Sequence, residues 1–260
     1  MGKAESTWKT ALTEVAPNEV RVRGYDIAEL MGRCSFGQVV YLLLRGELPD
    51  ERVSRLMDAI LVSSIDHGAS PPSALAARTV ASTGAPLSGA VGAGILAINA
   101  SHGGAIENCA RTLMEVVQTA EAGNGSTADA ADAVVQDYRA RKRRVAGFGH
   151  RMHTADPRTA RLFALADQAG VAGKYIEAAR AVEAALEKQR GKKLPINVDG
   201  AVGAVLCELG FEPRTMNGMF MIARCAGLVA HVGEEWDRER PMRKIDPTGY
   251  EYDGPAPRRL

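Results

Sequence analysis

The segment Gly147-Phe-Gly-His-Arg-Met-His-Thr-Ala-Asp-Pro-Arg158 decides how this chain is interpreted. Glycines let a backbone approach a ligand closely, and His150 between them and Arg151 can titrate or donate a hydrogen bond near neutral pH. Asp156-Pro157-Arg158 has the pattern of a helix start. A guanidinium there can bind a carboxylate through two parallel hydrogen bonds; an Asp cap beside a surface Arg is the structural alternative. The segment predicts a polar loop that leads into a helix.

Outward from this segment, helical spacing is common and strand-like alternation is almost absent. After Gly103-Gly104, the apolar residues from Ile106 to Val117 fall on one helix face. The same spacing predicts helices over 130–141 with Thr127 as the N-cap, over 157–170, over 174–189 and over 201–209. The glycine-rich stretch from Ser88 to Ile98 predicts a buried helix whose small residues allow close packing. We therefore expect a mainly α fold.

Composition narrows the classes of function. The 260 residues allow one large domain, or a main domain with a smaller one. Lys plus Arg number 32 and Asp plus Glu 31, so bulk charge does not favour nucleic-acid binding. The longest apolar runs, such as Val39 to Leu44, are far shorter than the roughly 20 residues that span a bilayer. With no signal-peptide pattern and no CxxC pair, we expect a cytoplasmic protein that binds neither nucleic acid nor membrane.

Three of the five histidines stand beside glycine, in Asp66-His67-Gly68, in Ser101-His102-Gly103-Gly104 and in the segment quoted above. A single histidine is more often structural or solvated, but three in such contexts favour a shared site. No pair has HxH, HxxxH or HExxH spacing, so we expect no metal.

Asn197-Val198-Asp199-Gly200 precedes an apolar run. Asp199 is a candidate general base, because burial among apolar groups raises the pKa of a carboxyl group. It is also a candidate N-cap for the helix that follows.

In order along the chain, these segments resemble the citrate synthase superfamily. The order is Asp-His-Gly, His-Gly-Gly-Ala-Ile-Glu, Gly-Phe-Gly-His-Arg…Asp-Pro-Arg, Asn-Val-Asp-Gly, Ala-Arg-x-x-Gly-x-x-Ala-His and Glu-Arg-Pro, from about Tyr25 to Pro241. The chain length, Asn-Val-Asp-Gly-x-x-Gly and the segment from Met216 to Phe220 are most similar to stand-alone citryl-CoA lyase and to the C-terminal module of ATP-citrate lyase. The resemblance implies a citrate-synthase-like helical fold, with a large domain from 1–102 plus 200–260 and a smaller inserted domain from 103–199.

The resemblance also implies three catalytic residues. His102 matches the histidine that hydrogen-bonds the thioester oxygen and steadies the enolate. His150 matches the one that bonds the central carbonyl or hydroxyl of oxaloacetate or citryl-CoA. Asp199 matches the carboxylate that moves a proton to or from the acetyl methyl group.

Binding residues follow from the same matches. His67, Arg158 and Arg224 correspond to ligands of the oxaloacetate carboxylates, and Arg240 to an arginine that reaches across a dimer into the partner's site. Two basic stretches, Lys142-Arg143-Arg144 and Lys192-Lys193, could meet the phosphates of coenzyme A. A solvated basic face is the alternative for both stretches.

The implied activity is cleavage of citryl-CoA to acetyl-CoA and oxaloacetate by retro-Claisen chemistry. A citrate-synthase-type acyltransferase, condensing an acyl-CoA with oxaloacetate or a related 2-oxo acid, is the alternative. A non-catalytic helical scaffold is a third hypothesis, against which the presence of His102, His150 and Asp199 argues. We expect a coenzyme A thioester as substrate, no permanently bound cofactor, and a homodimer or higher homo-oligomer.

Overall fold

The computed structural model describes residues 8–123, 125–149 and 154–243, together with Gly254, Ala256, Arg258 and Arg259. Three short strands come first: β1 (Thr13–Ala16), β2 (Glu19–Val22) and β3 (Tyr25–Asp26). The helices are α1 (Ile27–Leu30), α2 (Phe36–Arg45), α3 (Glu51–Ser64), α4 (Pro72–Ser82), α5 (Leu87–Leu96), α6 (Ala105–Gly123), α7 (Thr127–Ala140), α8 (Pro157–Ala169), α9 (Lys174–Arg190), α10 (Val198–Glu208) and α11 (Pro213–Arg238). The expectation of a mainly α fold is confirmed.

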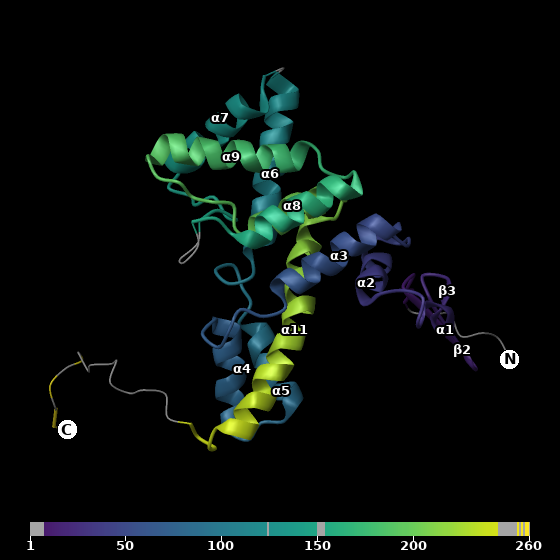
Figure 1. Ribbon diagram of the computed structural model, residues 1–260. Helices are drawn as coiled ribbons and strands as arrows, with labels where there is room; N and C mark the ends of the chain where they lie inside the picture. The colour runs from purple at the N-terminus through teal and green to yellow at the C-terminus, as the bar shows by residue number, and fades with distance from the viewer. Residues whose placement is uncertain are drawn as a thin grey trace.

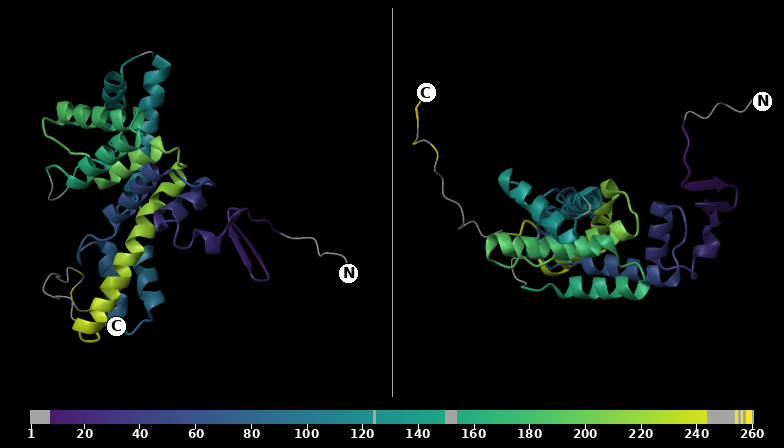
Figure 2. Two further views of the ribbon diagram at one scale, coloured as in Figure 1. Left: turned by 45° about the vertical axis from the view of Figure 1, so that its right-hand side comes forward. Right: turned by 90° about the horizontal axis from the view of Figure 1, so that it is seen from above.

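The strands form a small antiparallel sheet in the order β1-β2-β3. Thr13 pairs with Val22 and Ala16 with Glu19, so β1 and β2 make a hairpin. The sheet projects from the helical body at the N-terminal end of the described chain (Figures 1 and 2). Its own small core joins Val22 to Leu30 and Leu42. Sequence periodicity missed these strands because each has at most four residues.

The helical body has two parts along the 26-residue α11 (Figure 1). The helices α6, α7, α8 and α9 gather at one end with α10, while α4 and α5 pack together against the other end of α11. Helix α10 is buried from Val198 to Cys207, apart from the half-buried Asp199. A helix that is apolar all round in this way belongs in the interior of a protein. The predicted division into 1–102 plus 200–260 and 103–199 stays a prediction.

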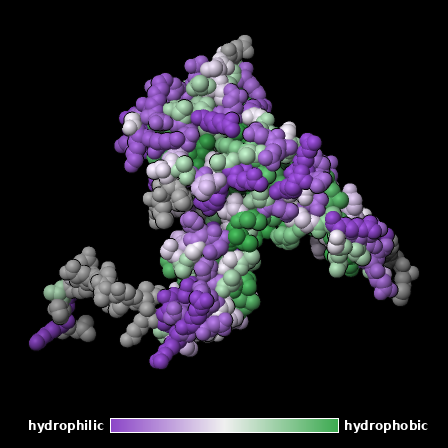
Figure 3. All heavy atoms as spheres, in the orientation of Figure 1, coloured by the Kyte–Doolittle hydropathy of each residue, from purple (hydrophilic) through white to green (hydrophobic). Residues whose placement is uncertain are grey.

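Two local expectations were wrong. The N-cap of α7 is Ser126, whose hydroxyl accepts the Asp129 N–H at 3.1 Å, and not Thr127. Helix α5 forms as expected, but most of it is not buried. Of its residues only Ala90 and Gly94 are buried, and Leu96 is 80% exposed. Apolar side chains accordingly show on the surface over α5 and the adjoining part of α11 (Figure 3).

Asn217 in α11 fixes where α6 begins. Its Oδ1 accepts the backbone N–H of Glu107 at 3.0 Å, which satisfies one of the donors that a helix start leaves open. The Met216–Phe220 segment thereby ties α11 to the helix that follows His102. In the described ranges, no helix is both long and apolar enough to cross a membrane.

Candidate active site

His102 lies in the tight connection between α5 and α6. Backbone hydrogen bonds join Asn99 and His102 in both directions, each at 2.8 Å. A Cβ on Gly103 would come within 2.6 Å of the Phe220 ring, and one on Gly104 within 2.6 Å of the Asn99 carbonyl. The two glycines therefore allow the turn to pack tightly enough to hold His102 between the helices.

Ser73 orients the His102 imidazole. The ring Nε2 lies 2.8 Å from Ser73 Oγ and 3.4 Å from the Ser73 backbone nitrogen. Because a backbone N–H only donates, Nε2 accepts and Nδ1 carries the proton. Burial, and then the charge of Arg224, lower the pKa of His102, which favours the neutral ring. Sequence reasoning missed Ser73, a fully buried serine in the first turn of α4 whose one signal is its place after Pro71-Pro72.

Asp199 occupies the first turn of α10, but it does not cap the helix. Asn197 is the N-cap, and its Oδ1 accepts the Gly200 N–H at 3.1 Å. Among the residues described, Asp199 Oδ1 is buried without a hydrogen-bond partner. Burial raises the pKa of Asp199 to about 6, although the charges of Arg158 and Arg224 oppose the rise. The carboxyl group therefore has the environment that a proton-transfer group needs.

The glycine-rich loop lies directly against the segment that enters α10. Asn197 donates from its backbone to the Gly147 carbonyl at 3.0 Å and from Nδ2 to the Gly149 carbonyl at 2.9 Å. The Gly149 N–H donates to the Pro195 carbonyl at 2.7 Å. A Cβ on Gly200 would lie 2.3 Å from the Gly147 oxygen, so this approach requires glycine. Two segments that are about 50 residues apart in the sequence thus lie side by side.

Arg224, in the middle of α11, is a buried guanidinium. Its Nε donates to the Ser64 carbonyl at 3.1 Å, and its Cζ lies 4.6 Å from the centre of the Phe220 ring. In the described part of the chain, Nη1 is buried with no hydrogen-bond partner. Phe220 also meets His102 edge-on, with 5.7 Å between ring centres. Sequence reasoning assigned Phe220 no role; its spacing of four residues from Arg224 on a helix was the available signal.

The buried Asp156 and the half-buried Arg158 form an ion pair at the start of α8. Asp156 is the N-cap, and its carboxylate binds Arg158 through Nε at 3.0 Å and Nη2 at 2.8 Å. It also accepts the Val198 N–H at 3.2 Å. Arg158 thus already forms with Asp156 the two parallel hydrogen bonds that were expected with a substrate carboxylate. The Arg158 side chain is 23% exposed, so part of it remains open to solvent.

The two arginines meet at the carbonyl end of α3. Arg158 Nη1 donates to the Ser63 carbonyl at 3.4 Å, one residue before the Ser64 carbonyl that Arg224 binds. His67 follows three residues later, exposed in the loop between α3 and α4. The structure therefore brings the predicted carboxylate ligands Arg158 and Arg224 together, next to the loop that carries His67.

The two remaining predicted site residues are His150 and Arg240. His150 lies outside the described residues, although the loop is described as far as Gly149. Arg240 is exposed beyond the end of α11. It follows Arg224 by sixteen residues, fourteen of them helical, which corresponds to about 21 Å along the helix axis. Within one chain, Arg240 is therefore remote from the Arg224 guanidinium.

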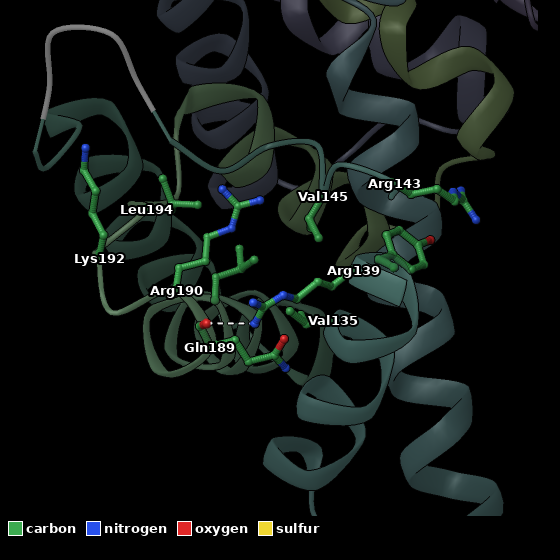
Figure 4. A pocket seen from close by; sticks show the side chains of 10 residues that line it. Val135, Arg139, Arg143, Val145, Gln189, Arg190, Lys192 and Leu194 are labelled. Carbon is green, nitrogen blue, oxygen red and sulfur yellow. Dashed lines mark hydrogen bonds between the residues drawn. The ribbon is translucent and has the colours of Figure 1, made fainter. Parts of the chain in front are cut away.

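Two of the basic residues predicted to bind coenzyme A share a cavity of about 450 Å³ between α7 and α9 (Figure 4). Arg143 and Lys192 line it, together with Arg139 and Arg190, which sequence reasoning did not select. Lys142, Arg144 and Lys193 are not among the described residues that line it. The described lining includes no carboxylate, so the cavity suits a polyanion.

In chemical terms, the site places an imidazole donor near Arg224 and a buried carboxyl group near both Arg158 and Arg224. Such a set can move a proton on an anionic substrate while stabilising an oxyanion. Within the described ranges, no three or more His, Cys, Asp or Glu side chains are arranged to hold a metal ion.

Replacing Asp199 with Asn should stabilise the protein at neutral pH. The folded pKa of about 6 lies above the ordinary 3.8, so the folded state tolerates the neutral carboxyl better than the charged one. The contribution of the neutral Asp199 carboxyl to the free energy of unfolding is fully present below pH 3.8 and is lost as the pH rises through about 6. At pH 7, Asp199→Asn should add about 2–3 kcal/mol to the free energy of unfolding, falling below about 1 kcal/mol at pH 4.

Urea unfolding at both pH values measures this difference. Asp237→Asn, at an exposed position of α11, is the matched control and should change little at either pH. An equal effect of Asp199→Asn at the two pH values would contradict a buried charge at Asp199.

Comparisons with known proteins agree with the resemblance seen in the sequence. A family model described as the C-terminal domain of citrate synthase matches residues 4–53 and 49–245. The citrate synthase of Haloferax volcanii is 31% identical over 226 residues, which cover 85% of this chain and 57% of the relative. The chain thus spans little more than half the length of that curated relative.

Several solved structures match nearly the whole chain. Citryl-CoA lyase from Hydrogenobacter thermophilus has a TM-score of 0.88 and 43% identity, with 98% of each chain covered. ATP citrate lyase from Methanothrix soehngenii has a TM-score of 0.85 and 22% identity, covering 98% of this chain and 43% of that one. The second likeness is one of fold. The match over residues 4–245 and these likenesses show that the chain belongs to the citrate synthase family.

Proposed function

We propose that this chain is a lyase that cleaves citryl-CoA to acetyl-CoA and oxaloacetate. The observation that carries the proposal is the buried Asp199 carboxyl beside Arg158 and Arg224. Its pKa is about 6, and its Oδ1 has no hydrogen-bond partner among the described residues. A carboxyl group that is half protonated near pH 6 can give a proton to a carbanion and take one back. The two guanidinium groups match a product that carries two carboxylates.

In the cleavage direction, a base removes the proton from the citryl hydroxyl group, which is the role expected of His150. The bond between the hydroxyl-bearing carbon and the acetyl CH₂ then breaks, and its electron pair forms the enolate of acetyl-CoA. His102 donates its Nδ1–H to the enolate oxygen, and Asp199 protonates the CH₂ carbon. A neutral imidazole suits the first role, because its N–H stabilises charge that develops only during the reaction.

Lyase rather than synthase activity is favoured by the likeness to citryl-CoA lyase from Hydrogenobacter thermophilus, which covers 98% of both chains at 43% identity. The citrate synthase of Haloferax volcanii is matched over only 57% of its length. A synthase must also hydrolyse citryl-CoA, so release of free coenzyme A separates the two activities.

The direct test is turnover of citryl-CoA by the purified protein, followed by mass spectrometry. We expect acetyl-CoA and oxaloacetate as products, and little free thiol when acetyl-CoA and oxaloacetate are supplied instead. Asp199→Asn should lower kcat by at least about 100-fold, since the proton donor is lost, while oxaloacetate binding survives. Steady release of coenzyme A and citrate would identify a synthase, and unchanged turnover would remove Asp199 from the mechanism.

The basic cavity is the proposed site for the phosphates of coenzyme A. Arg139, Arg143, Arg190 and Lys192 line it, and Arg143 is braced by the Tyr138 ring, 4.3 Å from its Cζ. Arg139 is fixed by a 3.0 Å hydrogen bond to the Gln189 carbonyl (Figure 4). Arg139 belongs to α7, Arg143 to the loop after α7, and Arg190 to α9. Cations from different segments can therefore face one polyanion.

Arg190→Ala should raise the KM for citryl-CoA about tenfold with little change in kcat, because a charged hydrogen bond to phosphate is lost in both ground and transition states. Arg180→Ala is the matched control, since Arg180 is an exposed arginine of the same helix that does not line the cavity. Initial rates over a range of citryl-CoA concentrations give both constants. Equal effects of the two variants would mean that the cavity does not bind the substrate.

A homodimer in which Arg240 enters the partner's site is the proposed assembly. Arg240 follows the end of α11, and the helix between Arg224 and its last residue is about 21 Å long. The segment after α11 is anchored, because Met242 N–H donates to the Ser82 carbonyl at 2.7 Å and Arg243 binds Glu235 at 2.6 Å. The exposed apolar residues of α5 offer a surface that a second copy could cover.

Mixing two inactive variants tests this assembly. Asp199→Asn and Arg240→Ala each damage a different half of a shared site. In reassorted dimers, one site of each heterodimer is intact, so activity should return to about a quarter of the wild-type value. Citryl-CoA turnover after co-expression measures the recovery. No recovery in a mixture shown to contain heterodimers would place Arg240 in its own chain's site or outside both sites.

A further inference from the structure

One face of α11 holds the loop that carries His67. Arg224, Gly227 and His231 are spaced by three and four residues, so they share that face. Each of them contacts a successive residue at the end of α3 and the start of that loop. Arg224 Nε donates to the Ser64 carbonyl at 3.1 Å, and Gly227 lies against the Ile65 carbonyl. His231 Nε2 lies 2.9 Å from Asp66 Oδ1.

Gly227 sets how close the two segments come. A Cβ at this position would lie 2.3 Å from the Ile65 oxygen, well inside van der Waals contact. The absence of a side chain therefore lets the loop backbone rest on the helix. This close approach brings Asp66 within hydrogen-bond distance of His231, one turn further along α11.

Asp66 links His231 to the backbone of the predicted substrate ligand. Its carboxylate accepts the N–H groups of His67 and Gly68, the latter at 2.9 Å. A carboxylate only accepts when ionised, so His231 Nε2 carries the proton that it shares with Asp66. These hydrogen bonds help to hold the pKa of Asp66 below its ordinary value, against the effect of burial, which raises it. The direction in which the chain leaves Asp66, and with it the placement of His67, depends on this carboxylate.

We infer that His231 is a positioning residue for substrate binding, which acts through Asp66 on His67. His231 lies seven residues beyond Arg224, about 10 Å along the helix axis, so it does not itself belong to the cluster around Asp199. The His231 side chain is 12% exposed and fixed by α11, whereas the Asp66 side chain is 42% exposed in a loop. The helix thus supplies the rigid partner and the loop the part that must be held. This inference rests on the proposed function, in which His67 binds a substrate carboxylate.

Oxaloacetate binding by titration calorimetry tests the inference without requiring turnover. His231→Leu removes the donor and should weaken oxaloacetate binding about tenfold, as for a lost hydrogen bond to a charged group. His231→Gln places an amide N–H where Nε2 stood and should restore binding to within about twofold of wild type. Asp66→Asn, at an exposed loop position that does not threaten folding, should reproduce the His231→Leu defect.

A double-mutant cycle with His67→Ala separates positioning from general stability. In the His67→Ala background, His231→Leu should cause no further loss of binding. Asp237→Asn on the same helix is the control and should bind as wild type. If His231→Leu lowers the melting temperature but leaves oxaloacetate binding unchanged, the positioning role is overturned and the contact is structural only.

The same experiment distinguishes this inference from the proposed function. If His67→Ala weakens binding and His231→Leu does not, the inference alone fails. If His67→Ala leaves oxaloacetate binding intact, then the assignment of His67 within the proposed function fails as well, and His231 has no ligand to position.

Discussion

A carboxyl group and a guanidinium group are buried near one another at the centre of this chain, and in its described part each keeps one polar atom without a partner. Burial of charge costs several kcal/mol per ion unless the groups are paired and hydrogen-bonded. Asp199 shows this cost directly in its raised pKa, which the nearby arginines only partly offset. The helices around it must therefore supply enough apolar contact to hold an arrangement that is unfavourable without a ligand.

Helix α10 supplies much of that contact. Its buried residues pack against α6, α8 and α9, so the turn that carries Asp199 is fixed from several sides. The entry to this helix is held by backbone bonds to Gly147 and Gly149, which leave little freedom in the position of Asp199. A site built on rigid elements in this way is organised before the substrate arrives.

Glycine contacts explain how segments far apart in sequence meet at this site. The backbone at Gly200 rests on Gly147 and that at Gly227 on Ile65, each at a distance that a Cβ would obstruct. Whereas the family match falls in two segments that meet at residues 49–53, the described site residues all lie within the second segment.

The sequence by itself determined the helical class and the family. Helical periodicity extends over many residues and reports a local preference, and ordered motifs around His102, Asp199 and Arg224 identified the family. The three strands were not predicted because they are too short to show an alternating pattern. The burial of α5 was wrongly predicted from its apolar composition, which carries no information about what covers the helix. Only the tertiary structure decided the partners of each group. Ser73 on His102, Asp156 on Arg158 and His231 on Asp66 are contacts between segments whose approach depends on packing, which no local pattern encodes.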